Sequence, residues 1–433
     1  MQGSDYHRRR QELMRLMGDE GIAIIPAAPE RRRNRDVFHP YRQDSDFGYL
    51  TGFGEPDAVA VLAPGREQGQ FLMFCRERDP SREVWEGAIV GQDRAVSDYG
   101  ADDAFPISDI DEILPGLLEG RSRVYANMGA DPAFDQRLVG WINEVRSGRS
   151  ARPPGEYVAL QPLLHEMRLI KSRSELTIMR RAAQISAEAH REAMRQVRPG
   201  MAEYELEALF QGRFRAHNGW PAYPPIVGGG ANACTLHYIS NDATLRDGDL
   251  VLIDAGVELT NYASDITRTF PVNGRFSAEQ RAVYEVVLRA QEAAIEAVHP
   301  DNHWNRPHEA ATRVLVDGML ELGLLSGDAD SVIENGDYRR FFMHRTGHWL
   351  GMDVHDVGDY RVDGHWRQLE PGQVMTIEPG LYIPPGSEGV PERFQGIGVR
   401  IEDDVVVTRE GCEILGDNTA PKRVADIEAL MQS

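Results

Sequence analysis

The segment VLIDAGVELTNYASDITRTF, residues 251–270, contains two strand-like runs joined by a short polar stretch. The first run ends near Asp254, and the second begins near Asp265. If the runs pair as a hairpin with an even-numbered loop centred near Leu259 and Thr260, the two aspartates face each other directly. Their Cα atoms would then lie about 4.5–5.5 Å apart on one face of an antiparallel sheet.

Two carboxylates so placed repel each other, and a fold gains no stability from them unless a cation lies between them. Asp254 and Asp265 are therefore candidate metal ligands. A different strand register would leave both side chains in solvent, and the hairpin by itself does not decide between these interpretations.

A second segment, FMHRTGHWLGMDVHD at residues 342–356, places His344, His348 and His355 close together in a chain with 13 histidines. Arg345 occupies the position of the glutamate in a zincin helix, so the pattern is not HExxH. A single histidine here would more often be structural. Three within one glycine-punctuated segment favour a functional site.

Two glutamates stand at the ends of apolar runs. Glu378 follows the run at residues 374–377, and the Pro-Gly turn after it would project its carboxylate at the strand tip. Glu402 shares a strand face with Arg400. Because an isolated buried carboxylate is costly, we expect Glu402 either to pair with Arg400 or to hold a metal that Arg400 orients.

Together these candidate ligands comprise four carboxylates and one imidazole. They are Asp254, Asp265, His348, Glu378 and Glu402. Four negative charges match two divalent cations, and oxygen-rich ligation favours ions such as Mn²⁺ or Co²⁺. We therefore expect two divalent metal ions, with Mn²⁺ as the first choice and Co²⁺ or Zn²⁺ as alternatives. Two such ions typically share a water or hydroxide whose pKa falls towards neutrality.

In their order and context these residues resemble the pita-bread metallopeptidase family, in its Xaa-Pro aminopeptidase (aminopeptidase P) branch. The resemblance covers nearly the whole chain. The motifs that carry it are DFGYLTGF (46–53), TLHY (235–238), DGDLVLIDAG (247–256), DITRTFP (265–271), HWLG (348–351), VHDVG (354–358), IEPGLY (377–382) and VRIEDD (399–404). Two positions depart from the family pattern: Arg345 replaces a usual glycine, and Pro224-Pro225 replaces smaller polar residues.

The resemblance implies an α+β fold, with a pita-bread catalytic domain over residues 171–433 after a creatinase-like α/β domain over residues 1–170. The first domain would serve oligomerisation and form the rim of the cleft.

The residue patterns agree with this division. Apolar runs at 21–25, 58–62, 70–74 and 123–127 alternate with helical stretches, and the segment GRSARPPG at 148–155 resembles a domain linker. Beyond it, capping boxes at Ser172 and Ser277 predict long helices, and strands of a largely antiparallel sheet fill the remaining length.

The resemblance also implies a ligand arrangement. Asp254 would bind one metal, His348 and Glu378 the other, and Asp265 and Glu402 would bridge them. A hydroxide shared by the ions would attack the carbonyl of the first residue, and Glu378 would pass the proton towards the proline nitrogen as general base.

Further residues take roles by the same resemblance. His237 and His355 would stabilise the oxyanion and position the peptide, and Arg400 joins the catalytic set. His344 would contact substrate. Trp85 would reach the substrate site of a neighbouring subunit.

The expected reaction is hydrolysis of the bond between any N-terminal residue and a following proline. Proline specificity follows from the resemblance alone. A prolidase restricted to Xaa-Pro dipeptides is the nearest alternative, but the stretch 355–378 contains no inserted arginine-bearing loop of the prolidase kind. A non-catalytic binding protein on the same scaffold would generally have lost metal ligands, whereas all five are present.

Composition limits the partners and the compartment. The 433 residues carry 47 Lys+Arg and 68 Asp+Glu, a net charge of −21 that disfavours binding to nucleic acid or anionic membranes. Three scattered cysteines suit a reducing compartment, and neither a secretory signal nor an 18-residue apolar run is found. We therefore expect a cytoplasmic protein, and the family resemblance implies a homodimer or homotetramer that acts on peptides with an N-terminal Xaa-Pro.

Overall fold

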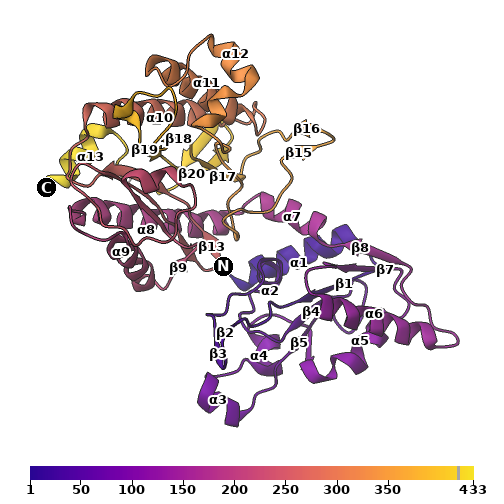
Figure 1. Ribbon diagram of the computed structural model, residues 1–433. Coiled ribbons are helices and arrows are strands. Elements are labelled where there is room, and N and C mark those ends of the chain that lie inside the picture. Colours follow the sequence, from indigo (N-terminus) through magenta and orange to yellow (C-terminus); the bar gives the residue numbers. More distant parts are fainter. Residues whose placement is uncertain (417–419) are drawn as a thin grey trace. The chain divides into compact units, whose positions relative to one another are not determined.

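The computed structural model describes residues 1–416 and 420–433, and the chain folds into two compact units, Met1–Arg168 and Leu169–Ser433 (Figure 1). The predicted domain boundary, between residues 170 and 171, lies two residues from this division. Within the described ranges, no helix has the length and apolar character needed to cross a membrane.

The first unit is built on a six-stranded mixed sheet in the order β6-β5-β4-β1-β7-β8. Its strands are β1 Gly21–Pro26, β4 Val59–Leu62, β5 Phe71–Cys75, β6 Asp103–Pro106, β7 Arg123–Ala126 and β8 Glu156–Ala159. Residues of β1, β4 and β5 are almost all buried, which explains why these strands are apolar throughout instead of alternating.

Seven helices and one small hairpin accompany this sheet among the described residues. They are α1 Gly3–Met17, α2 Ser45–Thr51, α3 Pro80–Glu86, α4 Gly91–Ser97, α5 Ile110–Leu118, α6 Pro132–Ser147 and α7 Gln161–Leu169, with the hairpin β2 Arg32–Asn34 and β3 Val37–Phe38.

The interpretation of residues 148–155 as a domain linker is wrong. These residues connect α6 to β8, and β8 pairs in parallel with β7 inside the sheet of the first unit. Glycine and proline favour any surface connection between elements, so the same composition serves a loop within a domain.

The second unit is rich in helices, and its long helices begin at the predicted capping boxes. Ser172 precedes α8 and Ser277 precedes α10, and each side chain accepts a bond from the backbone N–H three residues later. The helices are α8 Arg173–Gln196, α9 Glu203–Ala216, α10 Ala278–Glu296, α11 Arg306–Glu321, α12 Ala329–Asn335 and α13 Val424–Met431.

Every described strand pair of the second unit is antiparallel, which confirms the predicted sheet type. The strands are β9 Trp220–Pro221, β10 Ile226–Gly229, β11 Leu250–Asp254, β12 Val257–Leu259, β13 Tyr262–Ala263, β14 Thr267–Pro271, β15 Arg361–Val362, β16 His365–Trp366, β17 Val374–Ile377, β18 Gly380–Ile383, β19 Ile397–Arg400, β20 Asp403–Thr408 and β21 Gly411–Ile414. Within this unit, α10 and α11 lie on one side of the strands and α8 lies on the other (Figure 1).

The register of the acidic hairpin differs from the prediction. Asp254 pairs with Thr267, not with Asp265. The turn is centred on Thr260 and Asn261, whose φ angles of 53° and 62° are those that a tight two-residue hairpin turn requires. Moving the turn centre by one residue shifts every pair by two, and a shift of two keeps Asp265 on the same face as Asp254, at the diagonal position.

Candidate metal centre

The hairpin brings its two aspartates together in a buried site. The hydroxyl of Tyr223 lies 2.6 Å from Oδ1 of Asp254 and 2.5 Å from Oδ1 of Asp265, so one donor is placed between both carboxylates. Gly256 permits the two arms of the hairpin to approach closely here, because a Cβ at this position would lie 1.6 Å from the carbonyl oxygen of Ser264. The alternative of two solvated aspartates is therefore wrong.

His348 comes from a segment that runs beside the end of β17. Its backbone N–H donates to Oγ1 of Thr376 at 3.1 Å. Gly347 makes this approach possible, since a Cβ there would lie 1.9 Å from the carbonyl oxygen of Thr376. As a result, Nε2 of His348 lies 3.3 Å from Oδ2 of Asp265 and 3.7 Å from Oε1 of Glu378.

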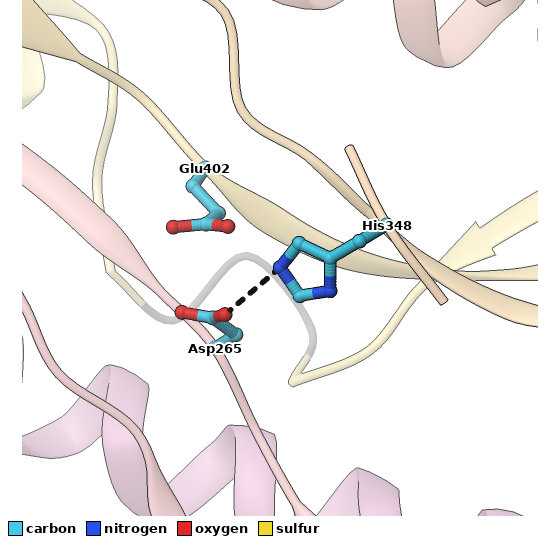
Figure 2. A group of neighbouring side chains, drawn as sticks. All are labelled: Asp265, His348 and Glu402. Atoms are coloured by element: carbon cyan, nitrogen blue, oxygen red, sulfur yellow. Dashed lines mark ion pairs between the residues drawn. The ribbon is translucent and has the colours of Figure 1, made fainter. Parts of the chain in front are cut away.

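Glu402, between β19 and β20, completes the cluster. Its backbone N–H donates to the carbonyl oxygen of Thr267 at 3.1 Å, which ties it to the aspartate hairpin. Asp265, His348 and Glu402 each offer one ligand atom, and these atoms lie within 4.8 Å of one another. Figure 2 shows the three side chains converging from different segments of the chain.

Arg400 forms its ion pair with Asp254 and not with Glu402. Its Nη2 donates to Oδ2 of Asp254 at 2.7 Å, and both side chains are buried. Nη1 donates to the hydroxyl of Tyr382 at 3.0 Å, and that hydroxyl lies 2.8 Å from Nε2 of His344. Arg400 thus connects the aspartate hairpin to the histidine segment.

Crowded carboxyl groups give this site an excess of negative charge. Burial and neighbouring carboxylates raise the pKa values of Asp265 and Glu402, and burial raises the pKa of Glu378 to about 7. Divalent cations remove such repulsion, and carboxylate oxygens with one imidazole nitrogen are suitable donors for them. The donor set therefore fits hard or borderline divalent metal ions.

The pKa values of Asp254 and His348 are shifted by the groups that contact each residue. Burial opposes ionisation of Asp254, but the charge of Arg400 and the hydrogen bond from Tyr223 hold its pKa below the ordinary value. Burial also disfavours a charged His348, yet its hydrogen bond to Asp265 and the nearby glutamate raise its pKa to about 9.

The predicted site residues of the second unit line one cavity of about 560 Å³. Its lining includes His237, Asp254, Asp265, His344, His348, His355, Glu378, Arg400 and Glu402. The imidazole rings of His348 and His355 lie 4.4 Å apart between centroids, close to perpendicular. Trp85, on α3 of the first unit, is 88% exposed, and its contact with a neighbouring subunit stays a prediction.

Several residues that shape the site were not predicted as site residues. The contacts of Tyr223 and Tyr382 with the site depend on tertiary packing, so no local pattern predicts them. Tyr382 is the last residue of the IEPGLY motif, and its place in that motif is the one signal that the sequence offers for it. Thr267 stands two residues after Asp265 on the same strand face, so strand alternation offers a signal for it.

Glu203, fully buried at the start of α9, is another missed residue. Its carboxylate accepts hydrogen bonds from the backbone N–H groups of Gly229 and Ala243, and from the side chains of Asn232 and Tyr238. These four donors all belong to the segment at residues 229–243, which contains His237.

Comparison with known proteins agrees with this geometry. A model of metallopeptidase family M24 matches residues 177–409, and a model of the aminopeptidase P N-terminal domain matches residues 6–125. The Xaa-Pro aminopeptidase of Escherichia coli is 45% identical over 431 residues, which are 99% of this chain and 97% of that relative.

Solved structures extend the agreement to the fold. Pseudomonas aeruginosa aminopeptidase PepP superimposes with a TM-score of 0.99 at 60% identity, covering 100% of this chain and 98% of that chain. Zinc-substituted Escherichia coli aminopeptidase P in complex with product superimposes with a TM-score of 0.97 at 44% identity, with the same coverage. These matches confirm the family resemblance and the α+β fold class. The chain therefore belongs to metallopeptidase family M24, in the aminopeptidase P branch that carries this N-terminal domain.

Proposed function

We propose that the chain is a metal-dependent Xaa-Pro aminopeptidase whose reaction takes place in the 560 Å³ cavity of the catalytic unit. The observation that carries this proposal is the convergence of four carboxylates and His348 on the wall of one cavity, in a chain that matches aminopeptidase P along its whole length. The enzyme is a hydrolase of peptides.

The residues that would hold the metal are Asp254, Asp265, His348, Glu378 and Glu402. When bound, two divalent ions would polarise the scissile carbonyl and lower the pKa of an attacking water. Mn²⁺ is the proposed ion, with Co²⁺ or Zn²⁺ as alternatives, because most of the donors are carboxylate oxygens.

Glu378 is the proposed general base. It lies at the tip of β17, on the cavity wall and within 3.7 Å of both His344 and His348. From this position its carboxylate can take a proton from the attacking water and deliver it to the proline nitrogen, which has no N–H of its own.

The histidines on the same wall are proposed to handle the peptide. His237 and His355 would donate to the developing oxyanion and position the scissile bond, and His344 would contact the substrate beyond it. Arg400 would act by holding the carboxylate of Asp254 ionised and in place through their 2.7 Å bond.

Peptides of graded length test this function. The metal-loaded enzyme should cleave an Xaa-Pro tripeptide and longer Xaa-Pro peptides, and should leave a matched peptide with alanine in place of proline intact. Cleavage of the Xaa-Pro dipeptide alone would identify a prolidase and refute the proposal, although the full-length relatives offer that alternative no support.

We also propose that the enzyme is a cytoplasmic homodimer or homotetramer. The exposed Trp85 offers an apolar surface of the kind that subunit contacts cover, and the three free cysteines suit a reducing compartment. Light scattering of the wild type and Trp85→Ala tests the assembly: a smaller mass for the variant supports it, and a monomeric wild type refutes it.

A further inference from the structure

A second, larger cavity adjoins the catalytic cavity. Its volume is about 890 Å³, and it lies among α11, α12 and the histidine segment. His344, Arg345 and Trp366 line both cavities. His344 also lies 3.7 Å from Glu378, so the wall beside the proposed general base is continuous with the wall of the second cavity.

The lining of this second cavity is cationic. It contains the four arginines Arg306, Arg313, Arg339 and Arg345, and one acidic residue, Glu309. Glu309 pairs with Arg306, and Arg313 pairs with Asp330.

Arg339 and Arg345 differ from the other two arginines. Over the ranges that the structure describes, neither has a carboxylate oxygen within 4 Å of its guanidinium nitrogens. Both side chains are exposed, so their charge is available to a ligand in the cavity.

Arg345 is held in one orientation at the junction of the two cavities. Its Nη1 donates to Oδ1 of Asn305 at 2.7 Å, and its guanidinium lies over the ring of Trp366, 5.0 Å from the centroid. The contact with Asn305 uses one of the five guanidinium N–H donors. The remaining donors suit a carboxylate, which guanidinium groups bind through paired hydrogen bonds.

The charge of the second cavity discriminates between the two ends of a peptide. Arginine side chains repel the N-terminal ammonium group of a peptide and attract its carboxylates. The amino terminus of the substrate is therefore disfavoured in this cavity, whereas an anionic group that follows the proline is favoured beside Arg345.

We propose that Arg345, assisted by Arg339, binds a carboxylate in the part of the substrate that follows the proline. The carboxylate is either an acidic side chain or the C-terminus of a short peptide. This inference rests on the proposed Xaa-Pro aminopeptidase function and adds to it a preference for anionic peptides.

Three peptides of one length test the preference: Ala-Pro-Ala-Glu amide, Ala-Pro-Ala-Gln amide, and Ala-Pro-Ala-Gln with a free C-terminus. For a rim ion pair we expect the KM of the acidic or free-acid peptide to be about fivefold below that of the neutral amide. Because the contact lies away from the scissile bond, kcat should be nearly equal among them. Comparing the side-chain and terminal carboxylates identifies which one is bound.

Substitutions of the arginines identify which residues cause the preference for anionic peptides. In Arg345→Gln the ratio of KM values between neutral and anionic peptides should fall to about one, and Arg339→Gln should reduce it in part. Arg313→Gln is the matched control, since Arg313 lines the same cavity but is already paired with Asp330, and it should retain the wild-type ratio.

Equilibrium binding of the product peptides Pro-Ala-Glu amide and Pro-Ala-Gln amide separates this inference from the proposed function. Absence of cleavage of every Xaa-Pro peptide would refute the function. Equal binding of these two products and of Pro-Ala-Gln with a free C-terminus by the wild type, or a preference that survives in the Arg345→Gln/Arg339→Gln double variant, would overturn the inference.

Discussion

Thr267 donates its hydroxyl to Oε2 of Glu402 at 2.6 Å, and both side chains are buried. The same hydroxyl oxygen accepts a hydrogen bond from Nε of Arg400 at 3.2 Å. Thr267 also pairs directly with Asp254 across the hairpin. Thr267, on the aspartate hairpin, therefore orients the carboxylate of Glu402, which is proposed to bridge the metal ions.

Removing the hydroxyl of Thr267 tests whether residues that contact the proposed ligands affect the affinity for metal. Thr267→Val keeps the shape of the side chain and should raise the metal dissociation constant about 10- to 100-fold, measured by competition with a chelator of known affinity. Thr408→Val, at the end of β20, is the control and should bind metal as the wild type does. Equal affinity of Thr267→Val and wild type would show that the hydroxyl does not orient Glu402 for the metal.

Lys171 and Asp356 form a buried ion pair, with Nζ and Oδ2 at 2.9 Å and each side chain 1% exposed. Lys171→Met leaves a buried carboxylate without its cation and should lower the free energy of unfolding by about 3–5 kcal/mol. The double variant with Asp356→Asn should recover part of this loss in denaturant titrations. Arg289→Gln, which removes an exposed pair with Glu321, should cost less than about 1 kcal/mol. A double variant as unstable as the sum of its single variants would contradict the account.

Glu203 accepts four hydrogen bonds from the segment at residues 229–243, which contains His237, and so holds this segment in place. Glu203→Gln replaces one oxygen by an NH₂ group that cannot accept, so we expect stability to fall by about 1–3 kcal/mol and kcat/KM to fall with it. Glu205→Gln, two residues later on the same helix, is the control for a glutamate at the start of α9. Wild-type kcat/KM in Glu203→Gln would show that this anchor does not position His237.

His190 gives the fold a dependence on pH. Complete burial lowers its pKa from 6.5 to about 3. Below pH 6.5 the unfolded chain binds a proton at this residue while the folded chain does not, so the free energy of unfolding decreases as the pH falls. Between pH 7.5 and 5.5 this decrease amounts to about 1.4 kcal/mol.

Urea titrations at the two pH values measure the effect. His190→Gln should lose this component of the pH dependence, whereas substitution of the exposed His39 by Gln should preserve it. An unchanged pH dependence in His190→Gln would contradict a neutral buried histidine.

Helices whose first residues form a capping box were predicted well from the sequence. The capping boxes at Ser172 and Ser277 begin α8 and α10 because the bonds involved span only three residues. Helix α6 was not predicted, although Asp131 followed by proline is a helix start signal, and Asp131 does cap this helix.

Contacts between distant segments were harder to predict. The aspartate register depends on a turn centred on Thr260 and Asn261, and a difference of one residue in that centre changes every pair. The hydroxyl of Tyr223 reaches Asp254 from 31 residues away, and no local pattern encodes that approach. The order of the motifs identified the family even though the strand register and the contact of Tyr223 were not predicted. A motif consists of residue types at fixed spacing, so it can be recognised without knowing these tertiary contacts.

Metal content measured together with Xaa-Pro cleavage tests the central claim most directly. The chelated wild type should be inactive towards an Xaa-Pro tripeptide and should regain activity as it takes up Mn²⁺, to about two ions per chain. Asp265→Asn should bind fewer ions and remain inactive at the same free Mn²⁺ concentration. Cleavage by metal-free wild type, or wild-type metal content and activity in Asp265→Asn, would contradict the account.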